Sequence, residues 1–357
     1  MRAVFDSHVH YSFAIPLAET VTLFRREFAM TDTARMVFLS LPHHEKNGVL
    51  TFDPTQNVKG LYLKTRFAPD AYAFAGLEHT GTALSEDERS RMYLLQAERA
   101  MAAGFDGFKM LEGYPGIRKV MGIPLCHPVY DRFYSYLEEN RIPVVMHLAN
   151  PEEYWDPDRV DEYAKKVGRF CDETYPTKAQ LHGEVDEILK KHPKLRLTLA
   201  HFGFLTYRIE DAEAWLERHE NTMLDITPGG EQYFNMLSDW PRWEEFLHKY
   251  RSRILYGTDF YAFPYNDEER WTQSVMNRPR FVRQFFETDT EHTYQGQLFC
   301  GVKLDDAVIS DIYWNNAVRE YGAPKPVDLS YLRQEAERLL TLPGADADDM
   351  RYILNTI

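Results

Sequence analysis

The chain has 357 residues, of which 44% are hydrophobic and 14% aromatic, so it can bury a large core and does not have the composition of a disordered protein. Its formal net charge is −14 and no Lys/Arg-rich run stands out, which argues against the clustered basic residues that nucleic-acid phosphates require. Three cysteines without a CxxC pair support neither a zinc–thiolate site nor a disulfide framework, and they suit a reducing cytoplasm.

Short apolar runs alternate with helical patterns along the chain, as in the repeated strand–helix units that build a parallel sheet. The clearest helix is expected over 86–103, because Ser85 can cap its start and Gly104 follows its end. The expected strands lie near 3–8, 35–40, 71–75, 107–110, 142–147, 195–201, 221–226 and 253–258, and the other expected helices near 17–30, 128–140, 177–191, 209–219, 242–250 and within 304–341.

This alternation predicts an α/β fold of the (β/α)8 TIM-barrel type. Such a barrel takes roughly 250 residues as one unit. The surplus is assigned to insertions after strands 5 and 8, over 151–193 and 260–300, and to a helical C-terminal extension at about 304–357. Because no repeat, low-complexity tract or linker marks a boundary, we expect a single domain over 1–357.

The most informative pattern is His8-Val9-His10, which follows a short apolar run over 3–5. Residues i and i+2 of a strand point to the same side, so both imidazoles would project together from its C-terminal end. Two neutral imidazoles held on one side are half of a divalent metal site, and Zn is the commonest occupant of nitrogen-rich sites. The pair alone is a weak signal, because any exposed strand can carry two histidines.

Further metal-binding side chains stand at the ends of later strand patterns. His147, His201 and Asp259 each close an apolar run with a polar residue that a hydrophobic strand would not otherwise choose. A parallel barrel brings the C-terminal ends of its strands to one face, where barrel active sites lie. The sequence therefore predicts that these side chains meet His8 and His10.

The order of these residues resembles the amidohydrolase superfamily, in particular its amidohydrolase-related (amidohydrolase 2) branch. That branch includes metal-dependent decarboxylases, lactonases and hydratases beside true hydrolases. The resemblance runs from residue 1 to about Gly322, so it covers most of the chain. It is carried by the stretches 104–110, 254–259 and 312–317 and by His8, His10, Lys109, His147, His201 and Asp259.

The resemblance implies one divalent ion, Zn or alternatively Mn, with a coordination position left open for water. Its implied ligands are His8, His10, His147 and Asp259. The implied catalytic residues are Asp259, as the base for the water, and His201, which polarises the water or the substrate. In binuclear relatives the matching histidine is itself a ligand, and a helix cap is the structural alternative for Asp259.

Lys109 decides the metal count in this resemblance. In binuclear relatives a lysine at this strand end is carboxylated and bridges two metals, whereas in the other branch it contacts a substrate anion. We expect a second metal only if Lys109 is carboxylated, and the neighbouring Glu112 is a candidate ligand for it. Further candidates for substrate contact, on loops or at the strand end of the same face, are Arg118, Tyr114, Asp225 and Glu231.

The expected function is metal-dependent hydrolysis of a C–N or C–O bond in an amide, lactone or ester of a small polar substrate that bears a carboxylate. Non-oxidative decarboxylation or hydration with the same ligands is the alternative, and a non-catalytic barrel would require an incomplete ligand set. No G-x-S-x-G, HExxH or phosphate-loop pattern competes. We expect a cytoplasmic protein with a small-molecule substrate and neither nucleic acid nor membrane as partner, and a homodimer stays open.

Overall fold

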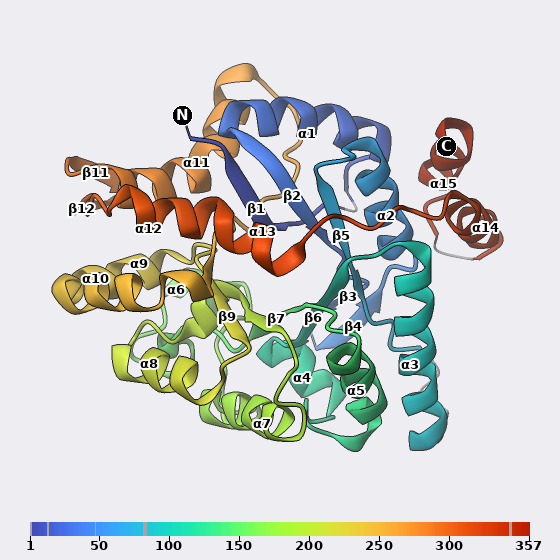
Figure 1. Cartoon of the computed structure of the whole chain (residues 1–357), viewed down its shortest axis with the longest axis horizontal. Coiled ribbons are helices and arrows are strands. Elements are labelled where there is room, and N and C mark those ends of the chain that lie inside the picture. The colour runs from blue at the N-terminus through green and yellow to red at the C-terminus, as the bar shows by residue number, and fades with distance from the viewer. Residues whose placement is uncertain (1, 13, 47, 81–83, 343–344) are drawn as a thin grey trace.

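The computed structural model describes residues 2–12, 14–46, 48–80, 84–342 and 345–357. Eight parallel strands form one sheet in the order β1-β2-β5-β6-β7-β8-β9-β10. The sheet closes where the Ser7 N–H donates to the Tyr256 carbonyl at 3.0 Å and the His10 N–H donates to the Phe260 carbonyl at 2.7 Å. Helices surround these strands (Figure 1), which confirms the predicted (β/α)8 barrel.

The barrel strands are β1 (Val4–Val9), β2 (Thr33–Leu39), β5 (Ala71–Gly76), β6 (Gly107–Gly113), β7 (Val144–Leu148), β8 (Leu197–Leu199), β9 (Thr222–Asp225) and β10 (Ile254–Leu255). Two antiparallel hairpins stand apart from the barrel sheet, namely β3 (His43–Lys46) with β4 (Val49–Phe52) and β11 (Glu291–Tyr294) with β12 (Gln297–Cys300). Short helical turns are η1 (Pro128–Tyr130), η2 (Glu152–Trp155), η3 (Ala200–Phe204), η4 (Arg251–Arg253) and η5 (Asp311–Asn315).

The helices of the first half are α1 (Leu17–Thr31), α2 (Gln56–Arg66), α3 (Glu86–Ala103), α4 (Pro115–Met121), α5 (Asp131–Glu139), α6 (Glu162–Lys166) and α7 (Lys178–Lys191). Those of the second half are α8 (Ile209–Arg218), α9 (Gly230–Ser238), α10 (Trp240–Lys249), α11 (Glu268–Glu287), α12 (Asp306–Ser310), α13 (Asn316–Tyr321), α14 (Leu329–Leu339) and α15 (Ala347–Thr356). The last two helices extend beyond the barrel at one edge of Figure 1, where α14 contacts α2 and α15 contacts α1. Across the described ranges, no helix is long and apolar enough to pass through a bilayer.

Capping residues fix the helix boundaries that the sequence predicts best. The Ser85 hydroxyl accepts the Glu88 N–H while the Glu88 carboxylate accepts the Ser85 N–H, which satisfies two donors that the first turn of α3 leaves unpaired. Gly104 ends α3 with a φ of 100°, a left-handed conformation that glycine adopts without a steric penalty. Thr177 and Gln180 form the same reciprocal pair at the start of α7.

Alternation along the barrel strands separates two hydrophobic clusters. In β5, Ala71, Ala73 and Ala75 pack in the larger outer cluster, whereas Tyr72 and Phe74 belong to a second, inner cluster. In β6, β7 and β9 the outer positions are occupied by hydrophobic side chains such as Phe108, Met146 and Leu224. The residues that directly follow them therefore point into the barrel near its C-terminal end, and these are Lys109, His147 and Asp225.

Two strands are shorter than expected. The strand expected over 195–201 ends at Leu199, because His201, Phe202 and Gly203 turn the chain in a left-handed conformation with φ of 53°, 56° and 60°. The strand expected over 253–258 keeps only Ile254–Leu255, because the Tyr256 N–H donates to the Ile312 carbonyl of η5 instead of a neighbouring strand.

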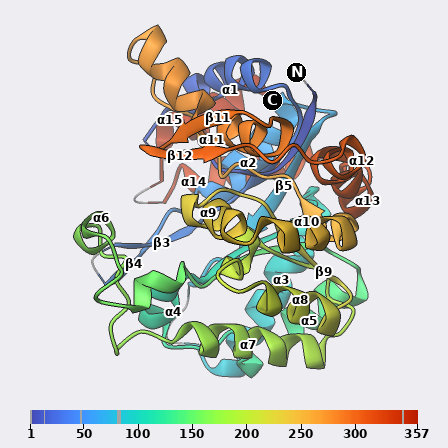
Figure 2. The same cartoon turned by 90° about the vertical axis from the view of Figure 1, so that its left-hand side faces the viewer.

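The insertion after β10 is more ordered than its sequence suggests. It contains the twenty-residue helix α11 and the hairpin β11–β12, which lie together in both views (Figure 2). The Glu27 carboxyl of α1 holds the start of this insertion, since its Oε1 accepts the Phe263 N–H at 3.1 Å. Glu27 is fully buried and its Oε2 has no hydrogen-bond partner among the described residues.

Glu27 is expected to make stability depend on pH. Burial raises the pKa of Glu27 from 4.5 to about 8, so the folded state holds this proton more tightly than the unfolded state and loses stability as pH rises through that window. We expect Glu27→Gln to match the wild type near pH 5 and to be more stable at pH 9 by roughly 2 kcal/mol. Thermal unfolding at the two pH values measures the difference, and an equal difference at both would contradict the prediction.

Candidate metal centre

Three predicted ligands meet at the C-terminal face of the barrel. One ligand atom each from His8, His10 and Asp259 lies within 4.8 Å of the others. The two histidine Nε2 atoms are 3.1 Å apart, and Asp259 Oδ1 lies 3.4 Å from Nε2 of His10 and 3.8 Å from Nε2 of His8. His8 belongs to β1, His10 follows it directly, and Asp259 follows β10 at the point where the barrel closes.

The hydrogen bonds behind the two imidazoles decide which ring nitrogens face this point. The His10 Nδ1–H donates to the Leu39 carbonyl at 2.9 Å, because a carbonyl oxygen can only accept. The His8 Nδ1–H donates to Asp225 Oδ2 at 2.9 Å. Burial lowers the pKa of His8, and it lowers the pKa of His10 to about 3, so both rings are neutral near pH 7. Both Nε2 atoms therefore present lone pairs to each other.

Two lone pairs and a carboxylate oxygen at these distances repel one another unless a cation or a proton lies between them. Neutral imidazole nitrogen and carboxylate oxygen are the donors that Zn²⁺ uses in catalytic sites. The donor set of this chain therefore fits a divalent cation.

Asp225 supports this arrangement from behind. Its Oδ1 accepts the His201 N–H at 2.8 Å and the Thr227 N–H at 3.1 Å, while its Oδ2 accepts from His8, and the residue is fully buried. A carboxylate behind a histidine fixes the tautomer and raises the basicity of the ligand nitrogen. Asp225 thus contacts His8 and does not line the cavity described below.

Replacing Asp225 by Asn is expected to weaken Zn²⁺ binding about tenfold, because the amide oxygen still accepts a hydrogen bond but the negative charge is lost. Competition with a chromophoric chelator measures the affinity. Asp158→Asn, which removes an exposed carboxylate, is the matched control and should leave the affinity unchanged. Equal affinities in wild type and Asp225→Asn would contradict the supporting role.

His147 and His201 lie beside the three-residue cluster. Their ring centroids are 4.9 Å apart, and the His201 ring is 5.4 Å from that of His8. His147 Nε2–H donates to the Ala149 carbonyl at 3.1 Å, and His147 has no ligand atom within the 4.8 Å group. Burial is the main cause that lowers the pKa of both rings. The left-handed turn of η3 brings His201 over this face, so both histidines can meet a ligand bound there.

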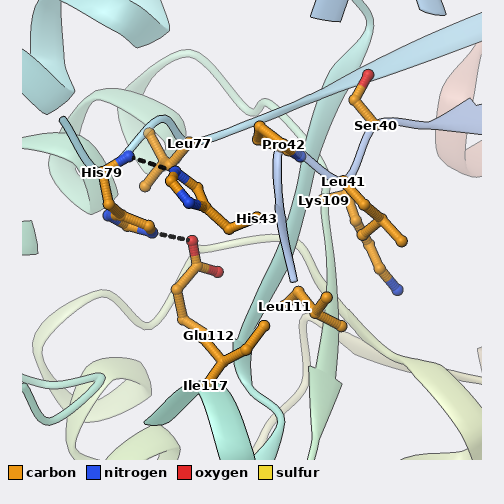
Figure 3. A pocket seen from close by; sticks show the side chains of 11 residues that line it. Ser40, Leu41, Pro42, His43, Leu77, His79, Lys109, Leu111, Glu112 and Ile117 are labelled. Carbon is orange, nitrogen blue, oxygen red and sulfur yellow. Dashed lines mark hydrogen bonds and ion pairs between the residues drawn. The ribbon is translucent and has the colours of Figure 1, made fainter. Parts of the chain in front are cut away.

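Lys109 and Glu112 are not brought together. Lys109 Nζ lies 3.3 Å from His8 Nε2, and burial lowers the pKa of this ammonium to about 8, against the opposing effect of nearby carboxylates. Glu112 instead pairs through Oε1 with His79 Nε2 at 2.7 Å, in a small chamber beside the barrel centre. In Figure 3 the Lys109 ammonium points away from the Glu112 carboxylate.

A cavity of about 860 Å³ opens onto the cluster and includes His8, His10, Lys109, His147, His201 and Asp259 in its lining. The insertion after β7 contributes Tyr154 and Arg169, and the insertion after β10 contributes Arg278 and Tyr294. A volume of this order suits a small molecule.

Only some of the predicted substrate-contact residues line this cavity. Tyr114 and Glu231 line it. Arg118 does not, because its guanidinium is turned to Glu184, with Nη2 donating to Oε1 at 2.8 Å and Nε to Oε2 at 3.1 Å. The structure therefore places Arg118 in an ion pair between α4 and α7, outside the lining of this cavity.

Sequence reasoning missed Arg278 of α11. Its Nη1–H donates to Asp259 Oδ2 at 2.7 Å and to the Asp259 carbonyl. Burial alone would raise the pKa of Asp259, but the charge of Arg278, with the nearby histidines, holds it well below the usual range. No motif marks this arginine, and α11 itself was not expected, so the sequence carried no signal for it.

Comparison with solved structures agrees with the barrel fold. An uncharacterized TIM-barrel protein from Bordetella bronchiseptica has a TM-score of 0.54 at 12% identity, over 85% of this chain and 83% of that one. The 4-oxalomesaconate hydratase of Rhodopseudomonas palustris has a TM-score of 0.52 at 15% identity, over 89% and 95%. The IDCase of Metarhizium anisopliae has a TM-score of 0.51 at 14% identity, over 89% and 97%.

Sequence comparison identifies the family. No curated protein matches the chain. A family model described as "Amidohydrolase" matches residues 78–323, which include Lys109, His147, His201 and Asp259 but begin after His8 and His10. Because this match covers more than half of the sequence, the chain belongs to the amidohydrolase family.

Proposed function

We propose that the protein is a metal-dependent hydrolase in which His8, His10 and Asp259 hold one divalent cation, with His147, whose ring lies beside this cluster, as the predicted fourth ligand. The observation that carries the proposal is the convergence of two neutral Nε2 atoms and one carboxylate oxygen at the floor of a cavity. The nitrogen-rich donor set favours Zn²⁺, with Mn²⁺ as the alternative. A second cation would require carboxylation of Lys109.

The side chains around the cluster can each take a separate role in hydrolysis. A divalent cation at this position would supply a Lewis acid that lowers the pKa of water from about 15.7 toward 7. Asp259 would accept the proton of the attacking water and deliver it to the leaving group. His201, which lines the cavity, would donate a hydrogen bond to the carbonyl oxygen as negative charge develops there.

The substrate is proposed to be a small polar molecule with a carboxylate and an amide, lactone or ester bond. Two cations, Lys109 and Arg278, line the cavity close to the metal ligands and support this choice. The same pair also favours a second candidate, non-oxidative decarboxylation or hydration, because a substrate carboxylate would be drawn next to the ligand cluster. In that case Asp259 or His201 would deliver a proton to carbon.

The two candidates differ in their products. Zn²⁺- and Mn²⁺-loaded protein should be tested against lactones and esters by proton release, against amides by release of the amine, and against hydroxybenzoate- and muconate-like acids by carbon dioxide release and loss of absorbance. Proton or amine release that disappears in metal-loaded Asp259→Asn would support hydrolysis. Carbon dioxide release or water addition would replace it by the second candidate, and no turnover in any arm would count against both.

A further inference from the structure

Arg278 binds Asp259 through one end of its guanidinium. Nη1 faces three oxygens, which are the Asp259 carboxylate Oδ2 at 2.7 Å, the Asp259 carbonyl and, at 3.4 Å, the Thr258 carbonyl. This contact crosses nineteen residues of sequence and joins α11 to the end of the barrel. It therefore ties the insertion after β10 to one of the proposed metal ligands.

The backbone of Asp259 needs such support. Its φ is 52°, in the left-handed region that non-glycine residues seldom adopt. By binding the carbonyl and Oδ2 together, Arg278 stabilises this conformation and occupies one lone pair of Oδ2, while the second lone pair can still accept the water proton. Only Oδ1 is left to face His8 and His10, so Asp259 is presented as a ligand through a single oxygen.

The other edge of the same guanidinium has no partner among the residues that the structure describes, and Arg278 belongs to the cavity lining. Within the described ranges Nε and Nη2 form no hydrogen bond, the side chain is 36% exposed, and Arg278 lines the cavity beside Tyr261 and Tyr294. The Tyr261 ring packs on His10 with centroids 5.1 Å apart, so the cavity wall that Arg278 shares with Tyr261 adjoins a proposed metal ligand. Two parallel N–H groups of an arginine match the two oxygens of a carboxylate.

We propose that Arg278 is a positioning residue with two roles: one end fixes Asp259 as a single-oxygen ligand, and the Nε/Nη2 edge forms a subsite for the substrate's carboxylate. This inference rests on the proposed metal-dependent function and adds to it the residue that recognises the anion.

The first test is metal affinity. Arg278→Gln keeps a helix-forming side chain but loses the charge, and Arg280→Gln makes the same change two residues along α11 at an exposed position outside the cavity lining. Chelator competition should give Arg278→Gln a roughly tenfold weaker Zn²⁺ affinity, as for other residues that orient a ligand. Arg280→Gln should match the wild type, and added guanidinium ion should restore part of the loss in Arg278→Gln but not change Arg280→Gln.

The second test uses benzoate as an anionic aromatic probe and benzamide as its neutral counterpart, both titrated calorimetrically into protein saturated with Zn²⁺. Wild type and Arg280→Gln should bind benzoate at least about tenfold more tightly than benzamide, and Arg278→Gln should lose that preference. A general structural defect would weaken both probes alike. Arg278→Lys should keep part of the preference, because it retains the charge without the paired N–H groups.

Unchanged Zn²⁺ affinity or an unchanged benzoate preference in Arg278→Gln would overturn the proposal while leaving the metal centre in place. A wild-type protein that does not bind Zn²⁺ at all would instead remove the proposed function, and this inference with it.

Discussion

Asp259→Asn is expected to lower kcat/KM by at least about 1000-fold in the presence of saturating metal, with little change in the thermal unfolding temperature. General acid–base catalysis alone typically contributes roughly 100- to 10,000-fold, and an amide can neither accept the water proton nor deliver it. The fold should persist, because the asparagine oxygen can still accept from Arg278 Nη1 in the place of Oδ2.

The same substitution should also weaken the metal site. If the asparagine oxygen accepts from Arg278, the amide nitrogen takes the place of Oδ1, which lies 3.4 Å from His10 Nε2. The amide N–H can then donate to the lone pair of His10 Nε2 that would otherwise bind the metal. Steady-state kinetics at several Zn²⁺ concentrations separates the two losses, with Asp158→Asn as the exposed-carboxylate control. Activity of Asp259→Asn within tenfold of the wild type would contradict the role of this carboxylate as the base.

His10→Ala is expected to abolish stable metal retention, with an affinity loss of more than about 100-fold, because it removes one of three converging donors and leaves a gap in the ligand set. It also leaves the buried Leu39 carbonyl without its donor, which costs about 1–3 kcal/mol of stability. Unfolding should therefore remain cooperative at a lower temperature.

The control for His10→Ala is His219→Ala. His219 pairs with Asp186 at 2.6 Å and does not line the cavity, so its loss should reduce stability without affecting metal content. Equal metal retention by His10→Ala and the wild type after dialysis would contradict the assignment of His10 as a ligand.

The barrel could be predicted because each strand end combines two local signals. Apolar runs set the strands, and a polar residue at the end of each run, such as His147 or Asp259, marks the face where they meet. The position of Asp225 at the end of β9 could also be predicted. Its contact with His8 could not, because a residue that contacts substrate and a residue that supports a metal ligand have the same appearance in sequence.

The other features of the candidate site could not be predicted, because they depend on long-range contacts that leave no periodic pattern in the sequence. Arg118 lies in helix α4 and not on a loop as the sequence predicts, and its guanidinium pairs with Glu184 on α7, 66 residues away. Arg278 reaches Asp259 from a helix whose charged residues and internal Pro279 hide its periodicity. The left-handed turn at His201 is similarly invisible, because it includes non-glycine residues that the surrounding packing holds in place.

The decisive measurement is a crystal structure of protein incubated with Zn²⁺, with anomalous diffraction at the zinc edge and elemental analysis of the same sample. We expect one equivalent per chain, with a single anomalous peak about 2.0–2.2 Å from Nε2 of His8 and His10 and from Oδ1 of Asp259. No bound zinc, or a peak that these three residues do not share, would contradict the metal centre and the chemistry proposed for it.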